Sequence, residues 1–240
     1  MKVAITFIGT NRYLDYLPKY YENIEKYFLP NTEKVILAFT DGELNDTPDN
    51  LKVYPQEHLD WPFITLKRFE IINKARDVID ECDWLVFIDA DAIPVTTITE
   101  YEFINPTKPL FGVHHPCHFL GMEPHTKAPG AYEQNTKCEA YVDVSKSLPP
   151  VYWQGCLWGG KVPYVCAMID ELEARVNRDL ENDIVAIWHD ETQINRYFLE
   201  RTEDVHTFGP EYAFPEVFEA QCNFSPKIVH LAKDNSKYHR

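Results

Sequence analysis

The stretch Asp83-Trp84-Leu85-Val86-Phe87-Ile88-Asp89-Ala90-Asp91-Ala92-Ile93-Pro94-Val95 decides the fold of this chain. Its apolar run, residues 84–88, is bounded by acidic residues, a pattern typical of a strand buried on both faces of a parallel or mixed sheet. Because strand side chains alternate, Asp89 and Asp91 are expected to project to one side, where the strand ends at the carboxyl edge of the sheet. The stretch therefore predicts an α/β fold with two carboxylates at that edge.

This carboxylate pair predicts a metal site. Two anions so close together repel each other unless a cation joins them. Oxygen ligands suit Mn²⁺ or Mg²⁺ better than zinc. Such an ion usually keeps open positions that the phosphates of a substrate can fill. Asp89 and Asp91 therefore indicate a nucleotide-type substrate bound through Mn²⁺ or Mg²⁺.

Three interpretations of the Asp-x-Asp stretch compete when it is considered alone. It resembles the metal-binding motif of many nucleotide-sugar glycosyltransferases. It also resembles the nucleophile strand of haloacid-dehalogenase-type phosphatases, in which Asp89 would be the nucleophile. The third interpretation is a strand followed by a polar turn with no chemical role.

Composition limits the class of protein. A chain of 240 residues with 45% hydrophobic content fits one large α/β domain, residues 1–240. The net charge of −15 opposes binding to nucleic acid or to an anionic membrane.

Location and redox state follow from simple counts. The six cysteines include no Cys-x-x-Cys pair, which argues against a zinc site and for reduced thiols. The N-terminal apolar run is too short for a signal peptide and is better interpreted as a first strand. No run of about 18 apolar residues predicts a membrane span. We therefore expect a soluble, cytoplasmic protein.

Periodicity places the remaining elements. Apolar runs predict strands at 2–8, 34–39, 110–113, 205–208 and 227–231. Apolar residues at spacings of three and four predict helices over 14–28, from Asp60 as the cap to Ile79, over about 162–177, and after Asp190. Residues 40–50 are expected to form a polar connection, and 117–150 a long loop over the site.

Several segments have a functional and a structural interpretation. Residues 151–160 combine aromatic residues with glycines, which suits a sugar ring but also suits a core strand with a glycine turn. Arg68 lies off the apolar face of its helix, so it is either a solvated surface charge or a ligand contact. Asp190 and Glu191 precede a helix, where they either cap it or form a positioned pair of acids.

The C-terminal tail is basic in an acidic chain. It is either a solvated end or a segment that folds over a diphosphate and closes the site. Its basic residues are Lys233, Lys237, His239 and Arg240.

Taken together, these pieces resemble the family-6 retaining glycosyltransferases, which include the blood-group A and B transferases and α-1,3-galactosyltransferase. The likeness runs from about Phe7 to the C-terminus, and the order and spacing of its motifs are specific enough to remove the phosphatase interpretation. Its strongest segments are Trp61-Pro62-Phe63 with Arg68, Asp89-Ala90-Asp91, Pro109-Leu110-Phe111-Gly112 with His115-Pro116, Tyr132-Glu133 with Ala140-Tyr141, Gly155 with Gly159-Gly160, Trp188-His189-Asp190-Glu191 with Asn195 and Tyr197, and Pro210-Glu211-Tyr212.

The resemblance implies a nucleotide-sugar transferase A-type fold, a single Rossmann-like domain around a mixed, mostly parallel sheet. Within it, residues 1 to about 95 would bind the nucleotide, and residues from about 96 to 240 would bind the donor sugar and the acceptor. It implies transfer of galactose or N-acetylgalactosamine from a UDP-sugar to a glycan hydroxyl, with an α-1,3 link and retention. By position, Asp89 and Asp91 would hold the metal and diphosphate, and Arg68 would bind the donor. The expected uracil and ribose contacts are Ile8, Gly9, Thr10 and Tyr13.

The resemblance also implies roles nearer the sugar. Asp190 would grip donor hydroxyls, Glu191 is the candidate nucleophile, and Trp188 would stack on the acceptor. His115 would contact donor or acceptor sugar, and His189 belongs to the same donor-site motif as Trp188. The residues expected to select the C2 group of the donor are Gln154, Gly155 and Cys156.

Departures from the family pattern refine these expectations. Cys156 is bulkier than the glycine or alanine usual there, which favours galactose over N-acetylgalactosamine. Both Asp-x-Asp carboxylates are kept, which favours metal dependence. The anchor and stem of animal relatives are missing, so a soluble microbial or viral form is expected. A carbohydrate-binding or UDP-sugar-binding protein without turnover is the alternative function.

Overall fold

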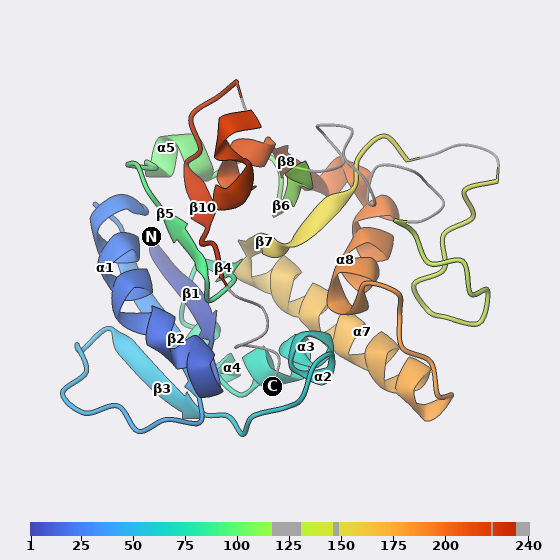
Figure 1. Ribbon diagram of the computed structural model, residues 1–240, viewed down its shortest axis with the longest axis horizontal. Coiled ribbons are helices and arrows are strands. Elements are labelled where there is room, and N and C mark those ends of the chain that lie inside the picture. Colours follow the sequence, from blue (N-terminus) through green and yellow to red (C-terminus); the bar gives the residue numbers. More distant parts are fainter. Residues whose placement is uncertain (117–130, 146–148, 222, 234–240) are drawn as a thin grey trace.

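The computed structural model describes residues 1–116, 131–145, 149–221 and 223–233, and its centre is a seven-stranded sheet (Figure 1). The strand order is β3-β2-β1-β4-β7-β6-β8, and among these described strands only β7 runs against the others. This mixed, mostly parallel sheet confirms the predicted Rossmann-like α/β class. Its strands are β1 (Lys2–Ile8), β2 (Glu33–Thr40), β3 (Leu51–Pro55), β4 (Trp84–Ile88), β6 (Leu110–His114), β7 (Trp153–Lys161) and β8 (Val205–Phe208).

Helices cover both faces of the sheet. In Figure 1, α1 lies beside β1 and β2, and α7 and α8 lie on the other side with α2 to α4. The helices are α1 (Leu17–Tyr27), α2 (Phe63–Leu66), α3 (Arg68–Asn73), α4 (Arg76–Ile79), α5 (Glu100–Phe103), α7 (Val162–Glu181) and α8 (His189–Leu199). Short 3₁₀ turns are η1 (Asn11–Tyr16), η2 (Thr202–Asp204), η3 (Pro210–Tyr212) and η4 (Glu216–Gln221).

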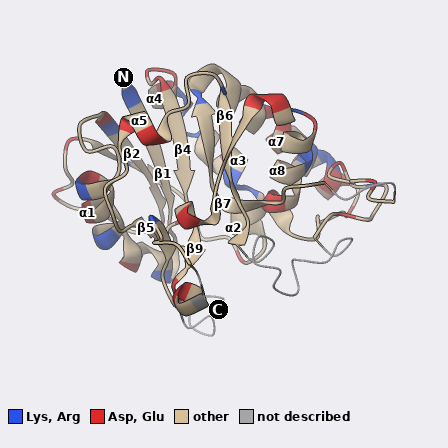
Figure 2. Cartoon of the chain, turned by 90° about the horizontal axis from the view of Figure 1, so that it is seen from above, with Lys and Arg blue, Asp and Glu red and all other residues tan. Residues whose placement is uncertain are grey.

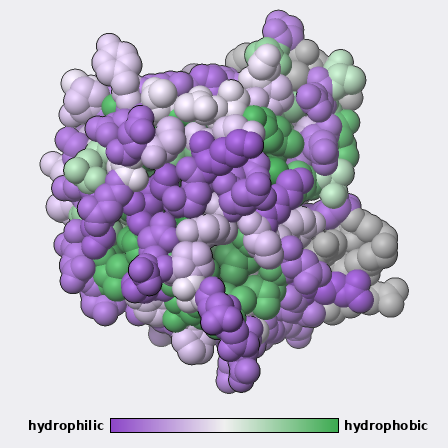
Figure 3. All heavy atoms as spheres, turned by 90° about the vertical axis from the view of Figure 1, so that its left-hand side faces the viewer, coloured by the Kyte–Doolittle hydropathy of each residue, from purple (hydrophilic) through white to green (hydrophobic). Residues whose placement is uncertain are grey.

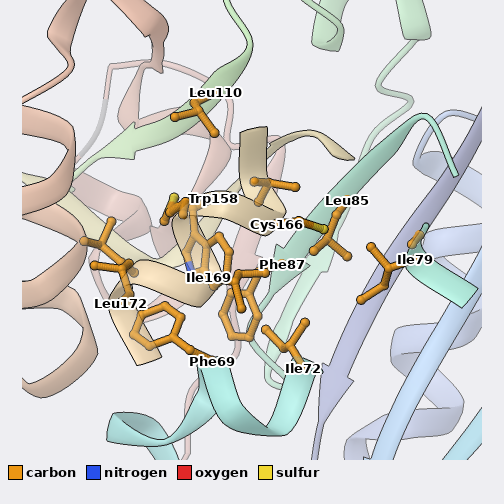
Figure 4. Close-up of a cluster of buried hydrophobic side chains, with 14 of the residues drawn as sticks. Phe69, Ile72, Ile79, Leu85, Phe87, Leu110, Trp158, Cys166, Ile169 and Leu172 are labelled. Carbon is orange, nitrogen blue, oxygen red and sulfur yellow. The ribbon is translucent and has the colours of Figure 1, made fainter. Parts of the chain in front are cut away.

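The alternation of strand side chains divides the core into two layers. In β4, Leu85 and Phe87 join the cluster under α3 and α7, whereas Val86 joins the cluster under α1. Figure 4 shows the first layer, in which Phe87 lies beside Trp158 and the residues from α3 and α7 close over them. Burial of each such side chain stabilises the fold by about 1.5–3 kcal/mol.

A second, three-stranded sheet joins the C-terminal segment to the residues that follow β4. Its order is β5 (Ala92–Pro94), β10 (Ile228–His230), β9 (Phe214–Pro215), and β10 pairs antiparallel with β5. This pairing places His230 opposite Ala92. The C-terminal segment is thereby held beside the end of β4.

Charged residues lie mostly on helices and loops, and the strands of the large sheet carry few of them (Figure 2). The side of the molecule that carries α1 and β3 is largely hydrophilic, with separate apolar patches (Figure 3). In the described part of the chain, no helix combines the length and apolar character that crossing a membrane would require.

One predicted helix was wrong, and one strand was not predicted. The helix expected from Asp60 to Ile79 is three short helices, because Lys67 and Ala75 adopt non-helical backbone angles between them. Asp60 does not cap it through its side chain; its carbonyl accepts a hydrogen bond from Phe63 N at 2.8 Å. The strand β3 was not predicted, because among its residues only Leu51 is buried and the apolar alternation is weak.

The aromatic stretch at 151–160 is mostly a core strand. Trp153 and Trp158 are 3% and 0% exposed, so neither can stack on a sugar. The predicted glycine turn was wrong, because Gly159 and Gly160 lie inside β7. A Cβ atom at Gly159 would be 2.2 Å from the carbonyl oxygen of Leu85, so glycine is needed for the close approach of β4 and β7.

Candidate active site

A cavity of about 380 Å³ opens at the carboxyl ends of β1 and β4, where the strand order reverses. Ligands of open α/β sheets bind in this crevice. The cavity is also lined by residues that the sequence did not single out, among them His58, Leu59 and Ile64. The predicted residues that line it are Ile8, Thr10, Tyr13, Arg68, Asp89, Asp91 and Lys233.

The end of β1 forms one wall. Thr10 Oγ1 lies 2.9 Å from His58 Nδ1, so the loop before α2 is tied to the turn after β1. Gly9 donates its N–H to Phe39 O at 3.0 Å, and a Cβ atom there would lie 2.3 Å from the Phe7 ring. Gly9 is therefore needed for the packing of this wall, and it does not itself border the cavity.

Asp89 and Asp91 lie together at the end of β4, as predicted. Asp89 N donates to Cys156 O at 3.0 Å, and Ala92 N donates to Asp89 O at 2.9 Å, which fixes the turn between the two carboxylates. The Asp91 carboxylate contacts Lys233 through one oxygen, and its other oxygen is 3.7 Å from His230 Nδ1. Burial alone would raise the pKa of Asp91, but His230 and Lys233 outweigh it and lower that pKa.

These side chains fit a divalent cation. Among the described residues, Asp89, Asp91 and His230 are the one group of potential ligands gathered closely enough, with their ligand atoms all within 4.8 Å of one another. Carboxylate oxygens with an imidazole nitrogen suit Mn²⁺ and other first-row ions. Sequence reasoning found the two carboxylates but missed His230.

Arg68 connects this carboxylate pair to a second one. The Nη1 atom of Arg68 donates to Gly155 O at 2.8 Å and lies 3.0 Å from Asp190 Oδ2 and 3.5 Å from Asp89 Oδ1. Its guanidinium carbon lies 4.4 Å from the centre of the Phe87 ring. With 6% exposure, Arg68 is not the solvated surface charge that helix spacing favoured.

Asp190 and Glu191 occupy the first turn of α8. Glu191 accepts hydrogen bonds from Tyr152 OH on one oxygen and from Gly155 N on the other, both at 2.8 Å. A Cβ atom at Gly155 would lie 3.0 Å from Glu191 Cβ, so glycine allows the strand backbone to approach the two acids. The orientation of the Glu191 carboxylate is thus fixed from two sides.

Both acids of α8 have raised pKa values. Burial is the largest cause for each, and it raises the pKa of Asp190 and of Glu191 to about 7. These values include the charge of Asp89, which contributes to the rise of both pKa values, and the charge of Arg68, which opposes it. Acids that change protonation near neutral pH are suited to catalysis and are common at functional sites. The raised pKa values therefore favour a positioned pair of acids over simple helix caps.

The other predicted sugar-site residues surround the acids without lining the cavity. Trp188 packs against the cluster that contains Tyr152, and the ring of His189 lies 4.8 Å from that of Trp61. His115 is 7% exposed, and its backbone N–H donates to Tyr152 O. Trp188 and His115 thus adjoin Tyr152, the residue that donates to Glu191, whereas His189 adjoins Trp61, which lines the cavity.

The side chains of Gln154 and Cys156 have different surroundings. The Oε1 atom of Gln154 is buried and has no hydrogen-bond donor among the described residues. Cys156 is 3% exposed and packs in the core cluster under α1. The described cysteines, Cys82, Cys138, Cys156 and Cys166, are free thiols, as predicted.

Some predictions fall on residues that the structure does not describe. Lys237, His239 and Arg240 lie outside the described residues, as do residues 117–130 and 146–148 of the loop predicted to cover the site. The described part of that loop is tied to the α7–α8 connection, since Glu133 accepts a hydrogen bond from Ile187 N. Sequence reasoning missed His58 and did not single out Tyr152, although Tyr152 lies within the aromatic segment 151–160.

Comparison with known proteins agrees with this geometry. The model of glycosyltransferase family 6 matches residues 1–239. The chain is 28% identical over 241 residues to the O-antigen biosynthesis glycosyltransferase WbnI of Escherichia coli, which covers 100% of this chain and 98% of WbnI. It is 24% identical over 240 residues to the histo-blood group ABO system transferase 2 of Rattus norvegicus, covering 96% of this chain and 68% of that protein. It is 26% identical over 230 residues to the globoside alpha-1,3-N-acetylgalactosaminyltransferase 1 of Mus musculus, covering 90% of this chain and 62% of that protein. With its cavity at the sheet edge and its two carboxylate pairs, the chain belongs to glycosyltransferase family 6.

Proposed function

We propose that the protein transfers galactose or N-acetylgalactosamine from UDP to a glycan hydroxyl, making an α-1,3 link with retention and depending on Mn²⁺ or Mg²⁺. The observation that carries the proposal is the position of Asp190 and Glu191. Glu191 accepts a hydrogen bond from Gly155 N, and Arg68 links Asp190 to Asp89 at the cavity. A relative named for α-1,3 transfer of N-acetylgalactosamine supports the linkage and the donor class.

In this proposal the cavity binds the nucleotide. Its volume of about 380 Å³ is in the range of ligand pockets. The uracil and ribose lie against Ile8, Thr10 and Tyr13, with Gly9 shaping the wall behind them. His58, tied to Thr10, adds a polar contact beside it. Residues 1 to about 95 thus supply most of the nucleotide site.

The diphosphate belongs at the Asp89 and Asp91 end. These two carboxylates and His230 would hold the divalent ion, which, when bound, withdraws electron density from the leaving diphosphate. Lys233 has its ammonium group at Asp91 and Tyr13, so it adds a positive charge at the same place. Lys237 and Arg240 are proposed to add to this charge from the tail.

The donor sugar lies between the two carboxylate pairs. Gln154 Oε1 is buried without a hydrogen-bond donor among the described residues, so it can accept a sugar hydroxyl. Asp190 Oδ2 is paired with Arg68 at 3.0 Å, and a carboxylate oxygen has a second lone pair that can accept another hydroxyl. Arg68 orients the Asp190 carboxylate and the Gly155 carbonyl that face this space. Trp188, with His115 and His189 nearby, forms the acceptor side.

Glu191 acts on the anomeric carbon. The bond from that carbon to the β-phosphate oxygen breaks with its electron pair leaving on UDP, and the acceptor oxygen forms the new bond while its proton is released with UDP. Retention proceeds either through a covalent bond to Glu191 or by same-face attack on an oxocarbenium-like centre that Glu191 stabilises. Both routes need Glu191 ionised and fixed, as its two hydrogen bonds provide.

A donor panel tests the proposal. The protein is incubated with several UDP-sugars, with and without Mn²⁺, and free UDP is measured. We expect release from UDP-galactose or UDP-N-acetylgalactosamine, and only when the metal is present. Absence of UDP release with every donor, with donor binding intact, would instead support a sugar-binding protein without turnover.

A further inference from the structure

His230 reaches the carboxylate pair through the second sheet. The antiparallel pairing of β10 with β5 sets His230 opposite Ala92, the residue after Asp91. Leu231 N also donates to Asp91 O at 2.9 Å, so backbone hydrogen bonds fix the end of β10 beside Asp91. The position of the imidazole is therefore set by a ladder of main-chain bonds and not by a flexible side chain of the tail.

The imidazole is placed as a metal ligand would be. Its Nδ1 atom is 3.7 Å from Asp91 Oδ1, and its Nε2 atom is buried with no hydrogen-bond partner among the described residues. Leaving such a group unpaired costs about 1–3 kcal/mol. Ligands on opposite sides of an ion are about 4 Å apart, so ligand atoms all within 4.8 Å need only small adjustments to share one ion.

Lys233 divides the Asp91 carboxylate between two tasks. Its ammonium group contacts Oδ2 of Asp91, while Oδ1 faces His230. Lys233 also donates to Tyr13 OH at 2.9 Å, which holds the ammonium group on the cavity side. One oxygen of Asp91 is thus neutralised by lysine, and the other is turned toward Asp89 and His230, where a cation can share all three.

We propose that His230 is the third protein ligand of the metal site and makes that site prefer Mn²⁺ to Mg²⁺, an inference that rests on the proposed metal-dependent function. Imidazole nitrogen binds first-row transition ions well, whereas Mg²⁺ is bound mainly by oxygen ligands and water. Two carboxylates alone would discriminate little between the ions. The nitrogen of His230 therefore supplies the selectivity.

Direct metal binding tests this inference without any measurement of turnover. Mn²⁺ is titrated into the protein with and without UDP, free Mn²⁺ is followed by electron paramagnetic resonance, and Mg²⁺ is added as competitor. For His230→Ala we expect Mn²⁺ affinity to fall by about tenfold or more, since even outer-shell partners of a metal contribute about ten- to hundredfold. Mg²⁺ affinity should change by less than about threefold, so the ratio falls.

Two further variants keep the test decisive. His230→Asn places a neutral oxygen where the nitrogen was, and we expect it to bind Mg²⁺ as well as the wild type does while its preference for Mn²⁺ is lost. His206→Ala, a histidine of β8 outside the site, is the matched control and should bind both ions as the wild type does. Thermal unfolding of each metal-free variant checks that it is folded.

The outcomes separate the two proposals. An unchanged ratio of Mn²⁺ to Mg²⁺ affinity in both His230 variants would overturn the role of His230 and leave the glycosyltransferase proposal intact. An equal loss of UDP affinity with and without metal would mean that His230 binds the nucleotide directly, which also overturns it. Wild-type protein that binds neither ion but releases UDP from its donor would overturn both metal claims and keep the transfer reaction.

Discussion

Asp91 and Asp190 are the same residue type and are each 4% exposed, yet their protonation equilibria are shifted in opposite directions. Asp91 is in contact with Lys233 and close to His230, and these partners lower its pKa. For Asp190, burial dominates: Arg68 is the largest opposing influence, but it is shared with Asp89, and the pKa of Asp190 rises to about 7.

One site can therefore hold two kinds of acid, one ionised and one close to its titration point. The end beside Lys233 keeps the Asp91 carboxylate ionised, which suits the binding of a cation and a diphosphate. The end beside Gly155 keeps its acids close to their titration point, which suits a group that must gain or stabilise charge during the reaction. Arg68 links the two ends and is the largest influence that limits the pKa of Asp190, whereas the hydrogen bonds from Gly155 and Tyr152 limit the pKa of Glu191 more than Arg68 does.

The largest effect is expected from neutralising the reacting acid, Glu191. For Glu191→Gln we expect transfer to fall by about a thousandfold or more, because the amide cannot become a nucleophile or stabilise positive charge. Binding of UDP, measured by calorimetry, should stay within about threefold of the wild type. A loss of UDP affinity with transfer largely kept would make Glu191 a structural residue.

The next largest effect is expected at the other pair. For Asp91→Asn, affinity for UDP in the presence of Mn²⁺ should drop by about ten- to hundredfold, because a charged ligand of the cation is lost. Asp49→Asn, at an exposed aspartate outside the site, is the matched control and should bind UDP normally. Equal affinity of Asp91→Asn and wild type would remove Asp91 from the donor site.

The pH profile of transfer sharpens the account of Glu191. Because its pKa is raised to about 7 and the ionised form is needed, kcat/KM should rise with pH and level off above about 7. The hydroxyl of Tyr152 lowers this pKa, so Tyr152→Phe should move the rise to higher pH. Tyr132→Phe, whose hydroxyl donates instead to Val151 O, is the control and should leave the profile in place.

The smallest effects concern stability and should have opposite signs. Because the pKa of Asp190 is higher in the folded state than in the unfolded state, its contribution is fully present below about pH 4 and is lost as pH rises toward 7 and above. At pH 8, Asp190→Asn should therefore raise the free energy of unfolding by about 1–2 kcal/mol, and below about pH 4 the change should be near zero.

For Asp91 the sign reverses. Its pKa is lowered by folding, so its ionised form stabilises the protein above the unfolded pKa, and that stability is lost as pH falls through the folded pKa. Asp91→Asn should lower the free energy of unfolding at pH 8 by about 1–3 kcal/mol, because Lys233 loses its partner. Urea denaturation of both variants checks the pair, and shifts of the same sign would contradict the comparison.

The features that sequence predicted well are local ones. The apolar run of β4 identifies a buried strand, and the two aspartates that follow it identify the carboxylates at its end, because both signals lie in adjacent residues. The same holds for Asp190 and Glu191 at the start of α8. In these segments, neighbours in sequence are neighbours in the site.

The features that sequence missed depend on contacts between distant segments. His230 reaches Asp91 only through the pairing of β10 with β5, and a three-residue strand gives little periodicity to predict from. His58 reaches Thr10 from a loop with no regular pattern. Arg68 was expected in solvent from helix spacing alone, because the bend at Lys67 that turns it inward is not visible in the apolar pattern.

A crystal structure of the Glu191→Gln variant with intact UDP-galactose and Mn²⁺ tests the division of labour between the two carboxylate pairs most directly. We expect Mn²⁺ to be bound by Asp89, Asp91 and His230, with the diphosphate beside Lys233 and the anomeric carbon facing residue 191. A diphosphate bound away from Asp89 and Asp91, or an anomeric carbon turned away from residue 191, would contradict it.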